Sequence, residues 1–183
     1  MKPETSMRNH DDYSADYLRS VLRDVKTIAL VGASANTVRP SFLVMKYLIE
    51  KGYTVVPVNP GMAGQDLLGQ KVYANLADIP IPIDMVDVFR NADAALAVTE
   101  EALTMSPPPK VIWLQLGVRN EAAAEMAETP GLRVVMNRCP KMEYGKLSGE
   151  WAWVGGNSGV ISSKRQVMNP SGRLQSLGIG KKS

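Results

Sequence analysis

Short apolar runs alternate with amphipathic segments along most of this 183-residue chain. The runs are hydrophobic almost throughout, which is typical of strands buried on both faces of a sheet. We predict strands over Thr27–Gly32, Tyr53–Pro60, Ile83–Phe89, Pro109–Gly117 and Leu132–Asn137.

The segments between these runs carry apolar residues at helical spacing. Ser14 and Asn120 are residue types that cap helix starts. Pro40 suits the first turn of a helix and Gly52 its end. We predict helices over residues 14–25, 40–52, 91–105 and 120–128.

Strands that alternate with helices indicate a parallel sheet covered on both faces. The expected fold class is α/β, a doubly wound, mainly parallel sheet of five or six strands in one Rossmann-like domain over residues 13–146. Residues 1–12 are polar, and we expect a flexible leader there. Residues 147–183 are expected to form a C-terminal extension that is partly packed, on the domain or on a second subunit, and disordered at its end.

Charge and hydropathy narrow the classes of partner. The net charge is +3, but the excess of basic residues comes from the chain beyond Lys146, and aromatic residues make up 6%. The domain therefore lacks the basic stripe and the stacking platform typical of nucleic-acid binding. No apolar run could span a bilayer and the N-terminus does not look like a signal peptide, so we expect a cytoplasmic protein without membrane contact.

Cys139 is the only cysteine and His10 the only histidine. This excludes an internal disulfide and multi-cysteine or histidine-rich metal sites, and argues against a histidine-dependent nucleophile. Arg138 and Lys141 near Cys139 would lower the pKa of its thiol, which could then form a mixed disulfide with a ligand. The favoured alternative is a small, partly buried residue at a helix start.

The loop Gly32–Arg39 follows the first predicted strand. In this fold, ligands bind beyond the carboxyl ends of the strands, where the strand order reverses. Gly32 permits a tight turn, and free amides of the helix that starts at Pro40 and Ser41 form an anion site. Arg39 adds a planar cation suited to phosphate, so we favour a phosphate loop over an ordinary loop with a surface arginine.

The dinucleotide fingerprint G-x-G-x-x-G is incomplete, because Ser34 and Thr37 stand where glycines are needed. The second strand ends around Asn59, with no carboxylate for the ribose of NAD until Asp66. An adenine nucleotide with an extra phosphate therefore fits better than NAD.

Six motifs follow one another between Lys26 and Tyr144: "VGAS....RPS", "GYTVVPVNP", "LGQKVYANLADIP", "IDMVDVFRNAD", "VIWLQLGVRNEAA" and "VVMNRCPKMEY". Together they resemble the CoA-binding domain family, small stand-alone Rossmann proteins similar to the N-terminal domain of the succinyl-CoA synthetase alpha chain. The resemblance implies binding of coenzyme A or an acyl-CoA. "GVISSKR" in the extension also resembles a tail seen in some members.

The resemblance also implies which residues meet the ligand. The CoA phosphates would contact Gly32, Ala33, Ser34, Arg39, Pro40 and Ser41. The adenine or ribose would lie against Val58, Asn59 and Pro60, and Phe89 and Arg90 would close the other wall, although Arg90 is equally read as a surface charge beside a helix. The ligase domain has a lysine where this chain has Met62, which leaves Lys71 or Arg39 as substitutes.

The chain is expected to act as a carrier, sensor or regulatory protein without catalytic residues. Two alternatives stay open: an NAD(P)-binding oxidoreductase, although Tyr144 and Lys146 lack the Tyr-x-x-x-Lys spacing, and a nucleotide-responsive regulatory subunit. A homodimer or partner contact would use the C-terminal extension.

Asp87 is expected to hold loop amides near the ligand, and Gln115 to point into the crevice or to satisfy neighbouring backbone.

Overall fold

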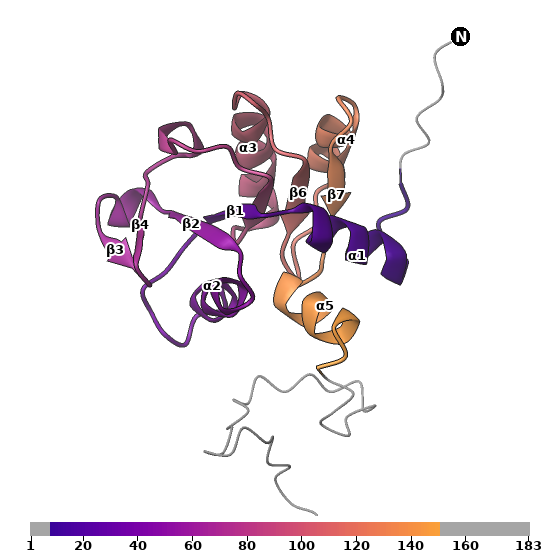
Figure 1. Ribbon diagram of the computed structural model, residues 1–183. Coiled ribbons are helices and arrows are strands. Elements are labelled where there is room, and N and C mark those ends of the chain that lie inside the picture. Colours follow the sequence, from indigo (N-terminus) through magenta and orange to yellow (C-terminus); the bar gives the residue numbers. More distant parts are fainter. Residues whose placement is uncertain (1–7, 151–183) are drawn as a thin grey trace, which may run out of the picture. The chain divides into compact units, whose positions relative to one another are not determined.

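The structure is a computed structural model that describes residues 8–150, with helices and strands in the alternating order predicted (Figure 1). The helices are α1 (Ala15–Asp24), α2 (Pro40–Glu50), α3 (Ala92–Leu103), α4 (Glu121–Glu128) and α5 (Pro140–Leu147). The strands are β1 (Thr27–Val31), β2 (Thr54–Val58), β3 (Asp66–Leu67), β4 (Gln70–Lys71), β5 (Met85–Val88), β6 (Val111–Leu114) and β7 (Arg133–Val135). Short 3-10 helices cover Pro60–Met62 and Leu76–Asp78.

The main sheet has five strands in the order β2-β1-β5-β6-β7, and every neighbouring pair is parallel. This confirms the predicted α/β class with a doubly wound parallel sheet. Residues 8–144 belong to one compact unit, and the described residues Gly145–Glu150 belong to a second unit that begins at Gly145.

Helices α3 and α4 lie on one face of the sheet, and α2 lies on the other (Figure 1). Val86, Val88, Ile112 and Leu114 of β5 and β6 are buried in one cluster with helical alanines. These alanines are Ala95, Ala102, Ala124 and Ala127. Because alanine adds little volume, α3 and α4 can lie close to the strands, and burial of this layer supplies much of the stability of the domain.

Two elements were not predicted. Strands β3 and β4 form a separate antiparallel hairpin of two residues each, joined by Leu68 and Gly69 at positive φ. So short a strand shows no periodicity in sequence. A helix start was considered at Cys139, but the extent of helix α5 was not predicted, because its segment is polar, contains Gly145 and lacks a clear apolar stripe.

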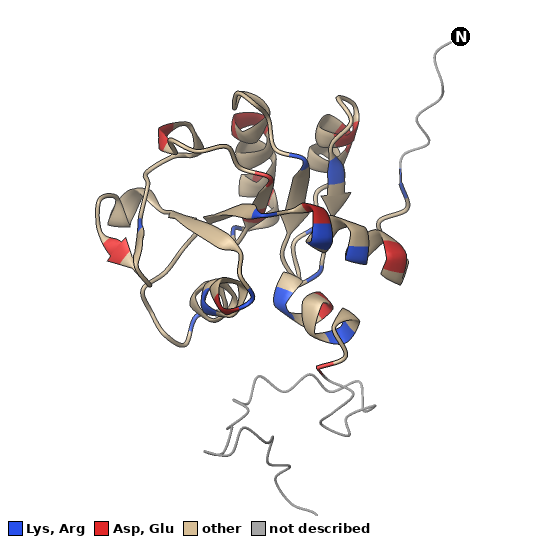
Figure 2. Cartoon of the chain, viewed as in Figure 1, with Lys and Arg blue, Asp and Glu red and all other residues tan. Residues whose placement is uncertain are grey.

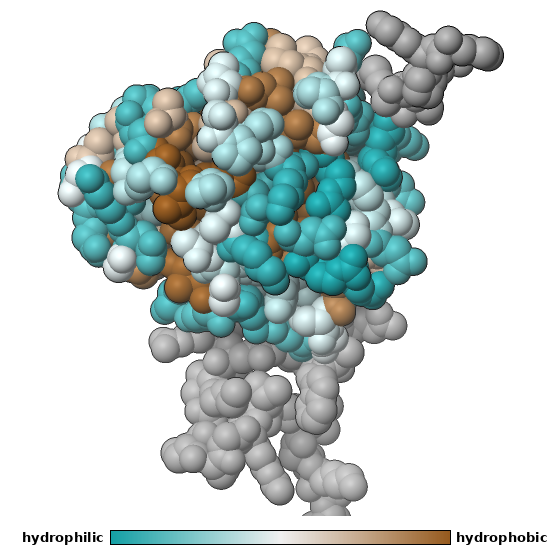
Figure 3. Space-filling view, turned by 45° about the horizontal axis from the view of Figure 1, so that its top comes forward, coloured by the Kyte–Doolittle hydropathy of each residue, from teal (hydrophilic) through white to brown (hydrophobic). Residues whose placement is uncertain are grey.

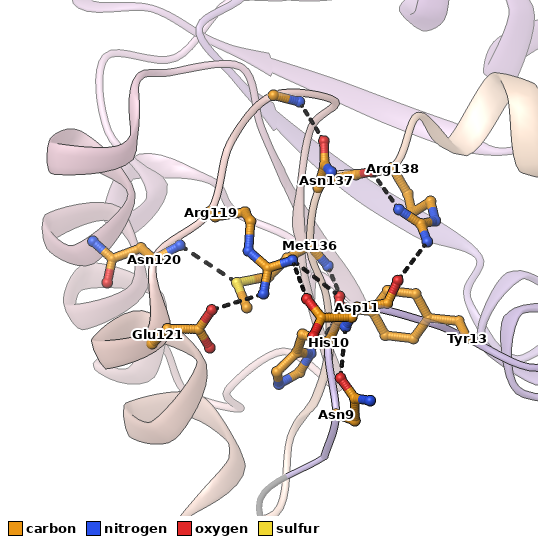
Figure 4. A network of polar contacts seen from close by, with 11 residues as sticks. Asn9, His10, Asp11, Tyr13, Arg119, Asn120, Glu121, Met136, Asn137 and Arg138 are labelled. Atoms are coloured by element: carbon orange, nitrogen blue, oxygen red, sulfur yellow. Dashed lines mark hydrogen bonds and ion pairs between the residues drawn. The ribbon is translucent and has the colours of Figure 1, made fainter.

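His10 was predicted to lie in a flexible leader, but its side chain is buried, with 4% of its surface exposed. Its Nδ1 lies 2.8 Å from the Tyr13 hydroxyl, which also accepts a hydrogen bond from the Met136 amide (Figure 4). Its other ring nitrogen, Nε2, lies 3.4 Å from Glu128 Oε1, so both nitrogens of the buried ring face polar groups. Residues 1–7 and 151–183, including Trp151, Trp153 and most of the predicted extension, lie outside the described residues.

Apolar side chains on the surface are scattered. The exposed large ones are Val38, Leu43, Leu68, Ile81 and Leu116. On the face seen in Figure 3, brown areas are separated by hydrophilic ones. No helix within residues 8–150 is long and apolar enough to cross a bilayer.

Candidate functional site

The reversal of strand order falls between β1 and β5, which are neighbours in the sheet. The chain leaves β1 for α2 on one face and leaves β5 for α3 on the other (Figure 1). The two connections therefore diverge at the carboxyl ends of these strands, and proteins of this fold bind their ligands in the crevice at such a point. The predicted loop Gly32–Arg39 lies at this point.

Gly32 is required by two independent features. Its φ is +91°, a conformation that side-chain-bearing residues rarely adopt. A Cβ at this position would lie 2.4 Å from the carbonyl oxygen of Phe89 and 3.2 Å from Cδ of Arg90. The loops that follow β1 and β5 are thus in direct contact at this glycine, as the crevice requires.

The rest of the loop is held by its own polar groups. The Asn36 amide donates to Ser34 Oγ over 3.1 Å, and the Val38 amide donates to Asn36 Oδ1 over 3.1 Å. The Arg39 amide donates to the Asn36 carbonyl over 3.0 Å. These bonds shape the loop locally, so its conformation does not depend on a ligand.

Helix α2 begins directly after this loop, with Pro40 in its first turn. No side chain caps this helix start, and Pro40 has no N–H to donate. The amides of Phe42 and Leu43 donate to the Arg39 carbonyl over 3.1 and 3.2 Å, so the Ser41 amide is the one of this first turn without a hydrogen bond among residues 8–150. Arg39 immediately precedes the helix and is exposed, and neither Arg39 nor Arg90 has an ion-pair partner among the described residues. A free amide beside an unpaired guanidinium is a combination that can bind phosphate at a helix start.

Asn59, predicted to flank a ligand, has its side-chain amide engaged within the protein. Its Nδ2 donates to the Ala33 carbonyl over 2.7 Å, and its Oδ1 accepts from the Gly61 amide over 2.8 Å. The amides of Gly32 and Ala33 donate to the Val58 carbonyl over 3.0 and 3.3 Å. Val58 and Asn59 therefore hold the loop Gly32–Arg39 in place, a role that was not predicted from the sequence.

Charges are distributed unequally over the two faces (Figure 2). The ionisable residues of α3 and α4 are all acidic, whereas α2 carries Lys46 as well as Glu50, and α5 carries Lys141 and Lys146 as well as Glu143. Arg39 also lies at the start of α2. Electrostatic potential therefore favours an anion on the side of α2 rather than on the side of α3.

The family model described as CoA binding domain matches residues 26–145. The chain belongs to this family. YneT, an uncharacterized protein of Bacillus subtilis strain 168, is 37% identical over 127 residues, which are 69% of this chain and 91% of YneT.

Solved structures agree with this membership in the CoA-binding domain family. A hypothetical protein from Pyrococcus horikoshii OT3 is 39% identical with a TM-score of 0.71, over 78% of this chain and 97% of that one. The dinucleotide-forming acetyl-coenzyme A synthetase 1 of Ca. Korarchaeum cryptofilum, in complex with phosphate and ADP, is 25% identical with a TM-score of 0.54. That similarity covers 64% of this chain and 27% of the synthetase, so the CoA-binding domain corresponds to one part of a larger protein.

Asp87 of this CoA-binding domain does not hold loop amides, contrary to prediction. Its side chain is fully buried, and its Oδ1 accepts a hydrogen bond from Gln115 Nε2 over 2.8 Å. Burial raises the pKa of Asp87 to about 8, against the smaller lowering effect of the Gln115 bond. Gln115 is itself buried and bonds to this carboxyl, so neither prediction for it, the crevice or the neighbouring backbone, was right.

Cys139 is buried just before α5, and burial raises the pKa of its thiol. Amides of Met142 and Lys141 act in the opposite direction but do not outweigh burial. Lys141 lowers the pKa of this thiol as predicted, but burial outweighs it, so the predicted net lowering is wrong. The guanidinium of Arg138 donates to the carbonyls of Asn137 and Asp11. The structure supports the reading of Cys139 as a packed residue at a helix start.

Residues 8–150 contain no cluster of His, Cys, Asp or Glu that could hold a metal ion. Most of the predicted ligand residues lie on one continuous segment, which is the loop after β1 and the start of α2. They are Gly32, Ala33, Ser34, Arg39, Pro40 and Ser41. Phe89 and Arg90 meet this loop at Gly32, and Val58 meets it through its carbonyl. The structure therefore brings together segments from the ends of β1, β2 and β5.

Proposed function

We propose that this crevice binds coenzyme A or an acyl-CoA, with the pyrophosphate at the start of α2. The observation that carries this proposal is that the Ser41 amide and the Arg39 guanidinium at the start of α2 have no partner among residues 8–150, at the strand-order reversal beside the Gly32–Phe89 contact. Membership in the CoA-binding domain family supports the choice of coenzyme A over other anions.

Each residue of the site then has a role. Four amides of this segment have no hydrogen bond among residues 8–150 and would donate to phosphate oxygens, those of Ser34, Ala35, Thr37 and Ser41. Arg39 and Arg90 would neutralise the phosphate charges from the two sides of the crevice. Val58, Pro60 and Phe89 would flank the adenine or ribose, and Asn59 would keep the loop in its binding conformation.

The biological role that we propose is that of a cytoplasmic carrier, sensor or regulatory protein rather than an enzyme. The crevice offers no histidine, and both Asp87 and Cys139 are buried below its surface. A contact with a second copy or with another protein through the extension after residue 146 remains part of this proposal.

Two measurements test the ligand. The full-length protein is purified from cells and denatured, and any released small molecule is identified by mass spectrometry. The stripped protein is then titrated with coenzyme A, NAD and NADP by calorimetry. We expect coenzyme A to be preferred, and an acyl chain on the released molecule would identify the natural form. Tight binding of NAD or NADP with no response to coenzyme A would overturn the proposal.

Arg39→Ala tests the phosphate loop. Loss of one charge-assisted contact should weaken coenzyme A binding by roughly tenfold to a hundredfold. Arg19→Ala is the matched control, because Arg19 is an equally exposed arginine on α1 whose partner is Asp16. Its loss should leave the affinity unchanged. Equal affinities of the two variants would mean that Arg39 does not meet the ligand.

A further inference from the structure

Three buried polar side chains from separate strands gather below the crevice. Asp87 of β5, Gln115 after β6 and Cys139 after β7 are exposed by 0%, 6% and 8%. Gln115 donates to one oxygen of Asp87, but the other, Oδ2, is buried with no hydrogen-bond partner among the described residues. The proposed function makes no use of this carboxyl.

The position of Asp87 relates it to the crevice. In the sheet, its Cα pairs with that of Leu30 in β1. Gly32 and Phe89, which touch each other at the crevice, follow these two residues by two positions each. Two residues of a strand span about 7 Å, so the carboxyl lies one layer below the phosphate loop.

Strand alternation also sets the face on which Asp87 lies. Val86 and Val88 belong to the core beneath α3 and α4, so Asp87 points to the opposite face, where α2 begins. This is the face on which the anion is expected. A charge on Asp87 would therefore act on the same side as the ligand phosphates.

Among residues 8–150, no charged side chain forms a hydrogen bond with Asp87. Its neighbours in the sheet are Leu30 and Trp113, and its hydrogen-bond partner is the neutral Gln115. The titratable group that faces it from the segment before α5 is the thiol of Cys139, whose pKa the Asp87 charge raises further. The first turn of α5 adds Lys141, which acts on Cys139, and the buried Glu143.

We propose that Asp87 couples ligand binding in this crevice to pH. The affinity for the anionic ligand is higher while Asp87 carries a proton and lower once that proton has left. This inference rests on the proposed function. A negative charge about 10 Å from a phosphate, at an effective dielectric constant of about 20, corresponds to roughly a tenfold loss of affinity. By linkage, a bound anion raises the proton affinity of Asp87, so binding near its midpoint takes up protons.

The test measures coenzyme A binding to the full-length protein by calorimetry from about pH 6.5 to about pH 9.5. Asp87→Asn is the matched variant, because asparagine has the same shape, accepts the Gln115 bond and cannot ionise. Both proteins meet the same ligand, so titration of the ligand cancels in the comparison. Cys139→Ser is the second control, since the thiol is the other group in the cluster that titrates in alkaline solution.

We expect the affinity of the unmodified protein and of Cys139→Ser to fall about tenfold more than that of Asp87→Asn over this range. Calorimetry near pH 8 in buffers of different ionisation enthalpy should show proton uptake on binding that Asp87→Asn lacks. Equal pH profiles with and without Asp87 would overturn this inference and leave the proposed function intact. Absence of coenzyme A binding by both proteins at every pH would overturn the proposed function and, with it, this inference.

A ligand-free measurement covers the case in which Asp87→Asn does not fold. Carbon-13 NMR of the unmodified protein follows the Asp87 carboxyl directly, with an expected midpoint near pH 8, as burial predicts. Since the unfolded chain loses this proton near pH 3.8, the protein should also lose stability as the pH rises from there to about 8. A carboxyl that titrates at its ordinary pKa would overturn the inference.

Discussion

At the scale of single residues, the crevice depends on Gly32. Several glycines of this chain have positive φ, but a Cβ at Gly32 would meet backbone atoms, whereas one at Gly52 would meet nothing within 4 Å. The backbone oxygen of Phe89 cannot move away as the end of a side chain could. At Gly32 the contact between the loops after β1 and β5 therefore leaves no room for a side chain.

Gly32→Ala should lower the free energy of unfolding by roughly 2 kcal/mol or more and should also weaken coenzyme A binding. The strain of a positive φ adds to the displacement of the Phe89 carbonyl. Gly52→Ala is the matched control, because its φ of +94° imposes similar strain without a clash. Urea unfolding and calorimetry measure both effects. If the two variants lost equal stability and bound equally well, the close approach would have no consequence.

At the scale of elements, the edge strand β7 is covered by side chains instead of another strand. The Tyr13 hydroxyl accepts from the Met136 amide over 2.7 Å, and the Tyr17 hydroxyl donates to the Val134 carbonyl over 3.0 Å. The rings of Tyr13 and Tyr17 stack with their centroids 5.8 Å apart. Arg119 and Arg138 both donate hydrogen bonds to Asp11 (Figure 4). An edge strand with its outward groups satisfied is protected from pairing with other chains.

Tyr13→Phe should destabilise the domain by about 1–3 kcal/mol, because it leaves the buried Met136 amide and His10 without their partner. Tyr17→Phe removes one bond to a carbonyl and should cost about 1 kcal/mol. Tyr73→Phe is a suitable control, since the Tyr73 hydroxyl has no hydrogen bond among residues 8–150. Chemical unfolding compares the three variants. If Tyr13→Phe lowered the free energy of unfolding no more than Tyr73→Phe does, this account of how strand β7 is protected would be contradicted.

At the scale of the whole molecule, the placement of the charged residues favours an anion, although the net charge is small. The net charge of the chain is only +3, yet acidic residues line α3 and α4, and Arg39 and Arg90 flank the crevice. A weak overall charge with local cations favours a small anionic ligand over a nucleic-acid backbone.

Coenzyme A affinity should therefore fall severalfold as NaCl rises from about 50 mM to about 500 mM, because salt screens contacts between exposed arginines and phosphates. Pantetheine, which lacks the phosphates, should bind more weakly and with little dependence on salt. Calorimetry at several salt concentrations measures both ligands. If the affinity of coenzyme A did not change with salt, phosphate capture would not be the main source of binding.

Local pattern in the sequence was enough to predict the five strands of the main sheet and the helices α1 to α4, while the phosphate loop at Gly32–Arg39 stays a prediction. These depend on periodicity, on helix-start residues and on the general rule that ligands bind where strand order reverses. The short hairpin β3–β4 and the extent of helix α5 could not be predicted from the sequence, because neither segment carries a periodic pattern of apolar residues.

The contacts of individual polar residues depend on parts of the chain far apart in sequence. Asp87 meets Gln115 at a separation of 28 residues, and Tyr13 meets Met136 at 123. Whether Asn59 faces a ligand or the Ala33 carbonyl, whether His10 is mobile or buried, and whether Asp87 holds a proton are set by what folding brings beside them. Burial and hydrogen-bond partners control these properties, and both are products of tertiary packing.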